Sequence, residues 1–165
     1  MHSAQYWVEK LGLVAHPEGG YFKETYRSVE TFDLDHSVID FPKGRNFSTS
    51  IYFLLTGNNF SAFHKIRSDE IWHFYDGEPI EVFYFENELK RILLGSNPEN
   101  DEVFQAVVPA GCWFASRLIS YSGFGLVGCT VSPGFDFQDF EMAERNALIL
   151  EYPSYSDIII ALTRS

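Results

Sequence analysis

The sequence has few cysteines, few basic residues and no long apolar run, and each shortage excludes a class of protein. The two cysteines, Cys112 and Cys129, form no CxxC pair and are too few for a disulfide framework. Twelve Lys and Arg stand against 23 Asp and Glu, a formal net charge of −11, so we expect neither nucleic acid nor an anionic membrane surface as a partner. No apolar segment has the length of a membrane span, and the N-terminus lacks the basic and apolar stretches of a signal peptide. We therefore expect a cytoplasmic protein.

Aromatic residues, by contrast, are abundant. Sixteen Phe, nine Tyr and three Trp favour β structure, because aromatic side chains fit half-buried pleated surfaces. Twelve Gly and seven Pro supply the turns that many short strands need. A length of 165 residues suits one domain, residues 1–165, with a hydrophobic core of its own.

The middle of the chain consists of successive strand candidates separated by turn signals such as Asp76-Gly77 and Pro109-Ala110-Gly111. This spacing is typical of an all-β sandwich or barrel. The predicted strands are Tyr21–Arg27, Phe47–Leu55, Ser61–Ile66, Glu70–Tyr75, Ile80–Phe85, Leu89–Leu94, Val103–Val108, Trp113–Leu118 and Phe124–Val131.

Helices are predicted at the two ends of the chain. Gln5–Leu11 has one apolar stripe and a stop signal at Gly12. Apolar residues of Phe140–Leu150 recur at helical spacing, and Ser154–Asp157 resembles a capping box before a second apolar segment. We expect these short helices to pack against the barrel.

The most informative segment for chemistry runs from His64 to Gly77. On a strand, His64 and Ile66 point to the same face, and Glu70 opens the next strand after a short turn. Gly77 then permits a tight hairpin. The pattern brings an imidazole and a carboxylate into one cavity, and both groups bind first-row metals and transfer protons.

This spacing resembles the two motifs of the cupin superfamily. Gly57, His64, Glu70 and Gly77 match the first motif, and Pro109-Ala110-Gly111 matches the turn of the second. The resemblance implies four metal ligands, but Ile66 and Phe114 stand where the motifs have histidines. Because only two ligands are left, we expect no cofactor and no dedicated metal site. The alternative is weak binding of a divalent metal at His64 and Glu70.

The wider chain is similar to the cupin family DUF985, also called Cupin_5. This resemblance implies a jelly-roll (double-stranded β-helix) barrel, usually a homodimer, similar to sugar-nucleotide epimerases and seed storage proteins, and it implies no known substrate. The matching stretches are His16–Ser28, Ser68–Phe74, Val108–Phe114 and Val131–Phe137.

Four further residues are candidate ligand contacts. Glu18 precedes a Gly-Gly pair that allows close approach to a ligand, although a tight turn explains the pair better. Tyr26 shares one face of the first predicted strand with Phe22 and Glu24, and either face of that strand is a candidate for the interior. Tyr52 lies on the more polar face of its strand, and Trp72 shares a face with Glu70.

His73 lies three residues after Glu70, so a regular strand turns it to the opposite face. Only a bulge brings it inward.

Two functions remain open. The first is binding of a small molecule, sugar-like or organic-acid-like, near His64 and Glu70. The alternative is a metal-independent epimerase or isomerase in which His64 is the general base and Glu70 orients it or acts as the acid.

Overall fold

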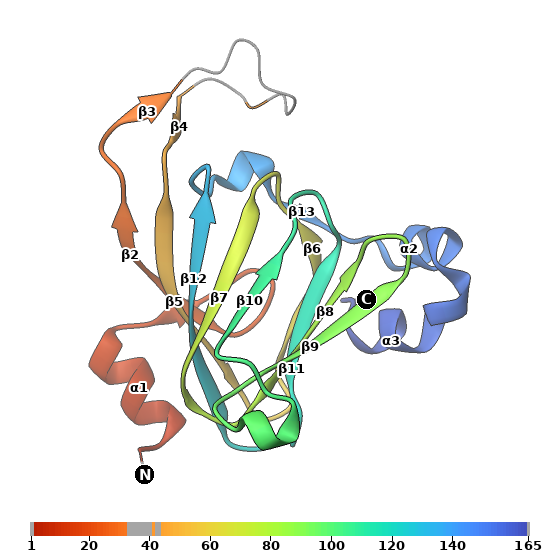
Figure 1. Ribbon diagram of the computed structural model, residues 1–165, viewed down its shortest axis with the longest axis horizontal. Helices are drawn as coiled ribbons and strands as arrows, with labels where there is room; N and C mark the ends of the chain where they lie inside the picture. The colour runs from red at the N-terminus through yellow and green to blue at the C-terminus, as the bar shows by residue number, and fades with distance from the viewer. Residues whose placement is uncertain (1, 33–40, 42–43, 165) are drawn as a thin grey trace.

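The computed structural model describes residues 2–32, 41 and 44–164, and two antiparallel sheets facing each other make up its main body (Figure 1). A small two-stranded sheet, β3 (Thr31–Phe32) with β4 (Arg45–Asn46), extends from one end. The six-stranded sheet contains, side by side, β1 (Val14–Ala15), β2 (Tyr21–Arg27), β5 (Thr49–Thr56), β12 (Phe124–Ser132), β7 (Asp69–Gly77) and β10 (Gln105–Val108). The five-stranded sheet contains β13 (Glu141–Met142), β6 (Phe60–Lys65), β11 (Phe114–Leu118), β8 (Ile80–Phe85) and β9 (Leu89–Leu94).

The main hydrophobic core lies between these two sheets. Alternate residues of each strand point inward, so Phe53, Trp72 and Val127 of one sheet meet Val82 and Phe114 of the other. The predicted β2, β8 and β9 are confirmed to the residue, and the other predicted strands differ at their ends by one or two residues.

The N-terminal helix α1 (Ala4–Leu11) covers part of the outer face of the six-stranded sheet (Figure 1). Ser3 caps its first turn, and Gly12 ends it in the left-handed conformation at φ 64°. Trp7 Nε1 donates a hydrogen bond to Asp76 Oδ2 at 3.2 Å and so ties the helix to β7. The prediction of a helix over Gln5–Leu11 with a stop at Gly12 is confirmed.

Two short helices of the C-terminal segment, α2 (Arg145–Glu151) and α3 (Ser156–Ala161), pack against the outer face of the five-stranded sheet. The predicted helix over Phe140–Leu150 is wrong in its first turn. Glu141–Met142 pairs with β6 instead, and Glu144 caps α2 by accepting hydrogen bonds from two backbone amides.

Three 3₁₀ turns complete the regular elements: η1 (Pro98–Asn100), η2 (Phe137–Asp139) and η3 (Pro153–Tyr155). None of the helices in the described part of the chain is long and apolar enough to cross a membrane.

Candidate functional site

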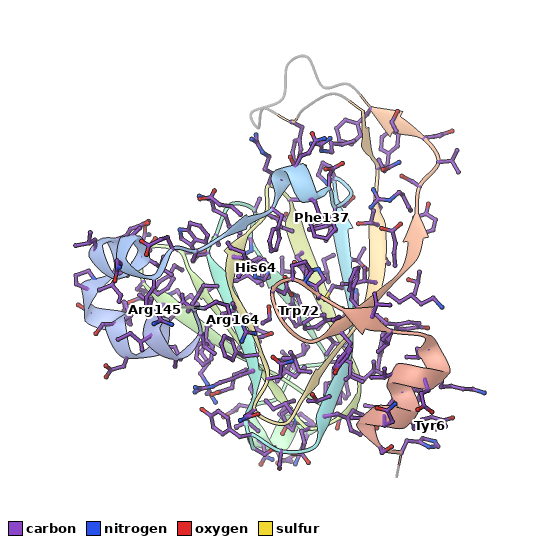
Figure 2. All side chains as sticks on the ribbon, turned by 180° about the vertical axis from the view of Figure 1, so that it is seen from behind. Tyr6, His64, Trp72, Phe137, Arg145 and Arg164 are labelled. Atoms are coloured by element: carbon purple, nitrogen blue, oxygen red, sulfur yellow. The ribbon has the colours of Figure 1, made fainter. Side chains whose placement is uncertain are left out.

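A cavity of about 250 Å³ lies between the sheets, and Asp136 and Phe137 at the start of η2 line part of it. His64 lies in the interior of the molecule, and Phe137 lies nearer the end that carries η2 (Figure 2). The wall of the cavity is mostly apolar, and its apolar members are Phe22, Ile51, Ile66, Val131, Phe135 and Phe137. Against this wall stand a few ionisable side chains.

The deepest ionisable pair is His64 with Glu18. His64 Nε2 lies 3.0 Å from Glu18 Oε2, and both side chains are more than nine-tenths buried. His64 Nδ1 lies 2.7 Å from the carbonyl oxygen of Ala62, and a carbonyl only accepts, so Nδ1 carries a hydrogen. Both ring nitrogens of His64 therefore already have protein partners.

The loop that carries Glu18 is held from several sides. Ser61 Oγ donates to Glu18 Oε1 at 2.9 Å, and the backbone amide of Ala62 donates to the carbonyl of Glu18 at 2.9 Å. Arg164 donates to the same carbonyl at 3.2 Å and to the carbonyl of Phe60 at 2.8 Å. Gly19 has φ 115°, and a Cβ there would collide with the backbone of Phe60, so this approach requires glycine.

Burial and mutual attraction act in opposite directions on this pair. Burial alone lowers the pKa of His64, but the charge and hydrogen bond of Glu18 outweigh it and raise the pKa above its ordinary value. Burial likewise opposes ionisation of Glu18, yet His64 outweighs it and the pKa of Glu18 is lowered. The two groups therefore favour each other's charged form, an imidazolium next to a carboxylate.

Glu70, at the start of β7, is the second buried carboxyl group. Burial, followed by the negative charge of Glu18, raises the pKa of Glu70 to about 7. The Cys129 thiol on the neighbouring β12 forms a hydrogen bond with Glu70, and burial holds the pKa of that thiol well above its usual value. Up to about neutral pH, Glu70 is consequently a neutral acid.

His16 adds a second imidazole. Its Nδ1 accepts a hydrogen bond from the backbone amide of Glu18 at 3.3 Å and lies 3.4 Å from Glu18 Oε2. Burial lowers the pKa of His16 in spite of the Glu18 charge, so this ring is neutral and packs edge-on against Phe22.

The donor set does not fit a divalent transition metal. Glu18 Oε2 faces His64 Nε2, and the carbonyl oxygen of Ala62 accepts a hydrogen bond from His64 Nδ1. The ring of Phe114, which stands where the cupin motif has a histidine ligand, packs with its centroid 4.0 Å from that of the His64 ring. Ile66 is apolar as well, and among the described residues no group of three or more His, Cys, Asp and Glu is arranged to hold a metal ion. An ion pair occupies the base of this cavity instead.

Of the predicted site residues, the structure brings Glu18, His64 and Glu70 together in the cavity. Trp72 packs in the core against Phe53 and does not line the cavity. Tyr52 lies on the outer face of the six-stranded sheet, because the alternate residues Thr49 and Ile51 of β5 point inward. His73 also lies on that outer face, as periodicity predicts, and bonds to Thr130 and Gln105.

Tyr26 is outside the cavity because β2 contains a bulge. Glu24 pairs with Ile51 and Tyr26 with Ser50, so Thr25 is an extra residue that reverses the alternation. Phe22 and Glu24 therefore face the cavity together with Arg27, while Tyr26 is 55% exposed. The sequence reasoning identified neither this reversal nor His16.

Comparisons with known proteins agree with this architecture. The profile of the Cupin superfamily family DUF985 matches residues 5–143, so the chain belongs to the DUF985 family of cupins. An uncharacterised protein of Saccharomyces cerevisiae, YML079W, is 37% identical in an alignment 149 residues long that covers 83% of this chain and 73% of the yeast protein.

Two solved structures are similar over their full length. A hypothetical protein from Leishmania major superposes with a TM-score of 0.91 at 32% identity, covering 99% of this chain and 100% of that one. Protein SO0799 from Shewanella oneidensis superposes with a TM-score of 0.89 at 37% identity, covering 99% of each chain.

Proposed function

We propose that this protein binds a small molecule in the cavity between its two sheets, which together form the jelly-roll barrel of the cupins. The observation that carries the proposal is the buried cluster of Glu18, His64 and Glu70 in a cavity of about 250 Å³ whose exposed wall is mostly apolar. An apolar wall with a few convergent polar groups is the usual composition of a small-molecule site.

Glu70 is the group of this cluster that contacts the ligand. Both nitrogens of His64 have protein partners, and both oxygens of Glu18 accept hydrogen bonds or face imidazoles. The carboxyl group of Glu70 has one protein partner, the thiol of Cys129, which leaves further hydrogen-bonding capacity toward the cavity.

A second candidate function is proton transfer on the bound molecule, as in an isomerase. The observation in its favour is the pKa of Glu70, which burial raises to about 7, because a general acid–base group works best when its pKa is near the working pH. In this candidate His64 is not the general base that the sequence predicts, because Glu18 raises the pKa of its imidazole and so favours the protonated ring. In this candidate, Glu70 takes and returns the proton.

The test is native mass spectrometry of the protein purified without denaturation, followed by extraction of what it carries. We expect a small organic molecule with the wild type and its loss with Glu70→Leu. The control, Glu141→Gln, changes an exposed carboxylate that pairs with Lys65 outside the cavity, and it should retain the molecule. Retention by Glu70→Leu, checked for folding by circular dichroism, would contradict the proposal.

A further inference from the structure

We infer that the cavity selects small uncharged carbonyl compounds, whose carbonyl oxygen accepts a hydrogen bond from the carboxyl group of Glu70, and rejects carboxylates and phosphates. This inference rests on the proposed binding function and narrows its ligand class.

The hydrogen bonds of Glu70 determine what the ligand must offer. The thiol of Cys129 stays protonated, so in its hydrogen bond with Glu70 it donates to a carboxyl oxygen. Glu70 is buried beside the negative charge of Glu18, which keeps a proton on its carboxyl group. The remaining O–H of Glu70 needs an acceptor on the cavity side, and a carbonyl oxygen is such an acceptor.

The charges of the cavity determine what the ligand must lack. Glu18, Glu24 and Asp136 are carboxylates, and Arg27 and His64 are the cations among the lining residues that the structure describes. Arg27 holds both oxygens of Glu24 through Nε and Nη2, at 3.0 and 2.7 Å, and its Nη1 donates to Asn46 Oδ1 and to the carbonyl of Phe135.

His64 is likewise held by Glu18, so both cations are already neutralised by a carboxylate. Asp136 in turn lies 3.5 Å from Arg45 Nη1, so each of these carboxylates faces a cation of the protein. An entering anion would therefore find no unpaired cation to offset the repulsion of the carboxylates. An uncharged molecule meets no such penalty.

The volume of the cavity also favours small uncharged carbonyl compounds as ligands. A volume of about 250 Å³ is below the range of about 300–1,000 Å³ that drug-sized ligands occupy, so a nucleotide or nucleotide sugar does not fit inside. The aromatic wall of Phe22, Phe135 and Phe137 suits a compact ligand with an apolar body.

The experiment uses benzamide and benzoate, which have the same shape and differ in charge. Chemical shifts of the Ile51, Ile66 and Val131 methyl groups, which line the cavity, report binding to the full-length protein at about pH 6. We expect benzamide to bind at least about tenfold more tightly than benzoate, and an apolar Glu70→Leu to lose at least about tenfold of the benzamide affinity. Glu70→Gln keeps an uncharged donor and should retain more of the benzamide affinity than Glu70→Leu does.

Glu24→Gln provides the sharpest variant, because it frees Arg27 at the partly exposed mouth of the cavity. It should raise the affinity for benzoate relative to benzamide at least about tenfold, whereas Glu141→Gln should change neither affinity. Equal binding of the two probes to the wild type would overturn the charge selection and leave the binding proposal standing. Unchanged benzamide affinity in Glu70→Leu, or no methyl shift with either probe, would overturn the inference even if a molecule co-purifies.

Discussion

Replacing Glu18 with glutamine removes the carboxylate that faces the buried imidazole of His64, and the consequence for stability depends on pH. In the wild type the pKa of His64 is raised, against the effect of burial, by Glu18. That contribution to the free energy of unfolding is complete below about pH 6.5, the unfolded value, and is lost as the pH rises through the folded pKa. In Glu18→Gln the effect of burial is opposed by the hydrogen bond to Ala62 and the charge of Glu70 alone, so we expect the folded pKa to fall below the unfolded one and stability to be lost as the pH falls.

The geometry of the pair sets the size of the effect. At 3.0 Å, two unit charges attract by about 5 kcal/mol for an effective dielectric constant of about 20, before desolvation is counted. Removal of one partner of a buried pair typically costs about 3–5 kcal/mol. We therefore expect Glu18→Gln to lose about 3–5 kcal/mol at about pH 5.5 and no more than about 2 kcal/mol at about pH 9, where the neutral imidazole needs no counter-charge.

The assay is urea unfolding of both proteins at the two pH values. Glu141→Gln, which removes an exposed carboxylate 3.1 Å from Lys65, serves as the control and should cost less than about 1 kcal/mol at either pH. A loss by Glu18→Gln that is below about 1 kcal/mol at about pH 5.5, or that is the same at both pH values, would refute the reasoning.

Three further predictions concern the surroundings of this pair. Glu70→Gln should gain up to about 3 kcal/mol of stability relative to the wild type between about pH 4.5 and pH 8. Burial and Glu18 raise the pKa of folded Glu70 to about 7, so the wild type loses stability over the range in which the unfolded carboxyl group ionises and the folded one keeps its proton; urea unfolding measures the gain, and a gap independent of pH contradicts it. Arg164→Met removes the donor to the carbonyl of Glu18 and should lower the free energy of unfolding by about 1 kcal/mol. It should also lower the pKa of His64 toward its ordinary value in an NMR titration, and an unchanged titration would mean that Arg164 does not position Glu18. Addition of zinc or manganese, or of a chelator, should leave the melting temperature of the wild type unchanged, because both ring nitrogens of His64 have protein partners. A clear stabilisation by either metal would contradict this assignment of the His64 hydrogen bonds.

Most of the fold follows from patterns in the sequence that act over short distances. The short apolar segments of β8 and β9 and the stop signal at Gly12 are local features, and the structure agrees with both. The helix predicted from Phe140 begins later, because pairing of Glu141–Met142 with β6 overrides local helical spacing. The single domain, the homodimer and the cytoplasmic location stay predictions.

The site was harder to predict because its partners meet through tertiary structure. The motif spacing placed His64 and Glu70 in one cavity, but the imidazole pairs with Glu18, which a loop brings from 46 residues away to 3.0 Å. Because of the bulge at Thr25, Arg27 and not Tyr26 lines the cavity. No local pattern in the sequence of β2 predicts this bulge.

The central claim is that an ion pair of His64 with Glu18, and no metal, sets the charge at the base of a ligand cavity. Long-range ¹H–¹⁵N NMR of the His64 ring in the wild type, with and without a chelator, tests it most directly. The account predicts protonation of both ring nitrogens at neutral pH and identical spectra in both samples. A neutral His64 ring that titrates below about pH 6.5, or one whose resonances change on chelation, would contradict it.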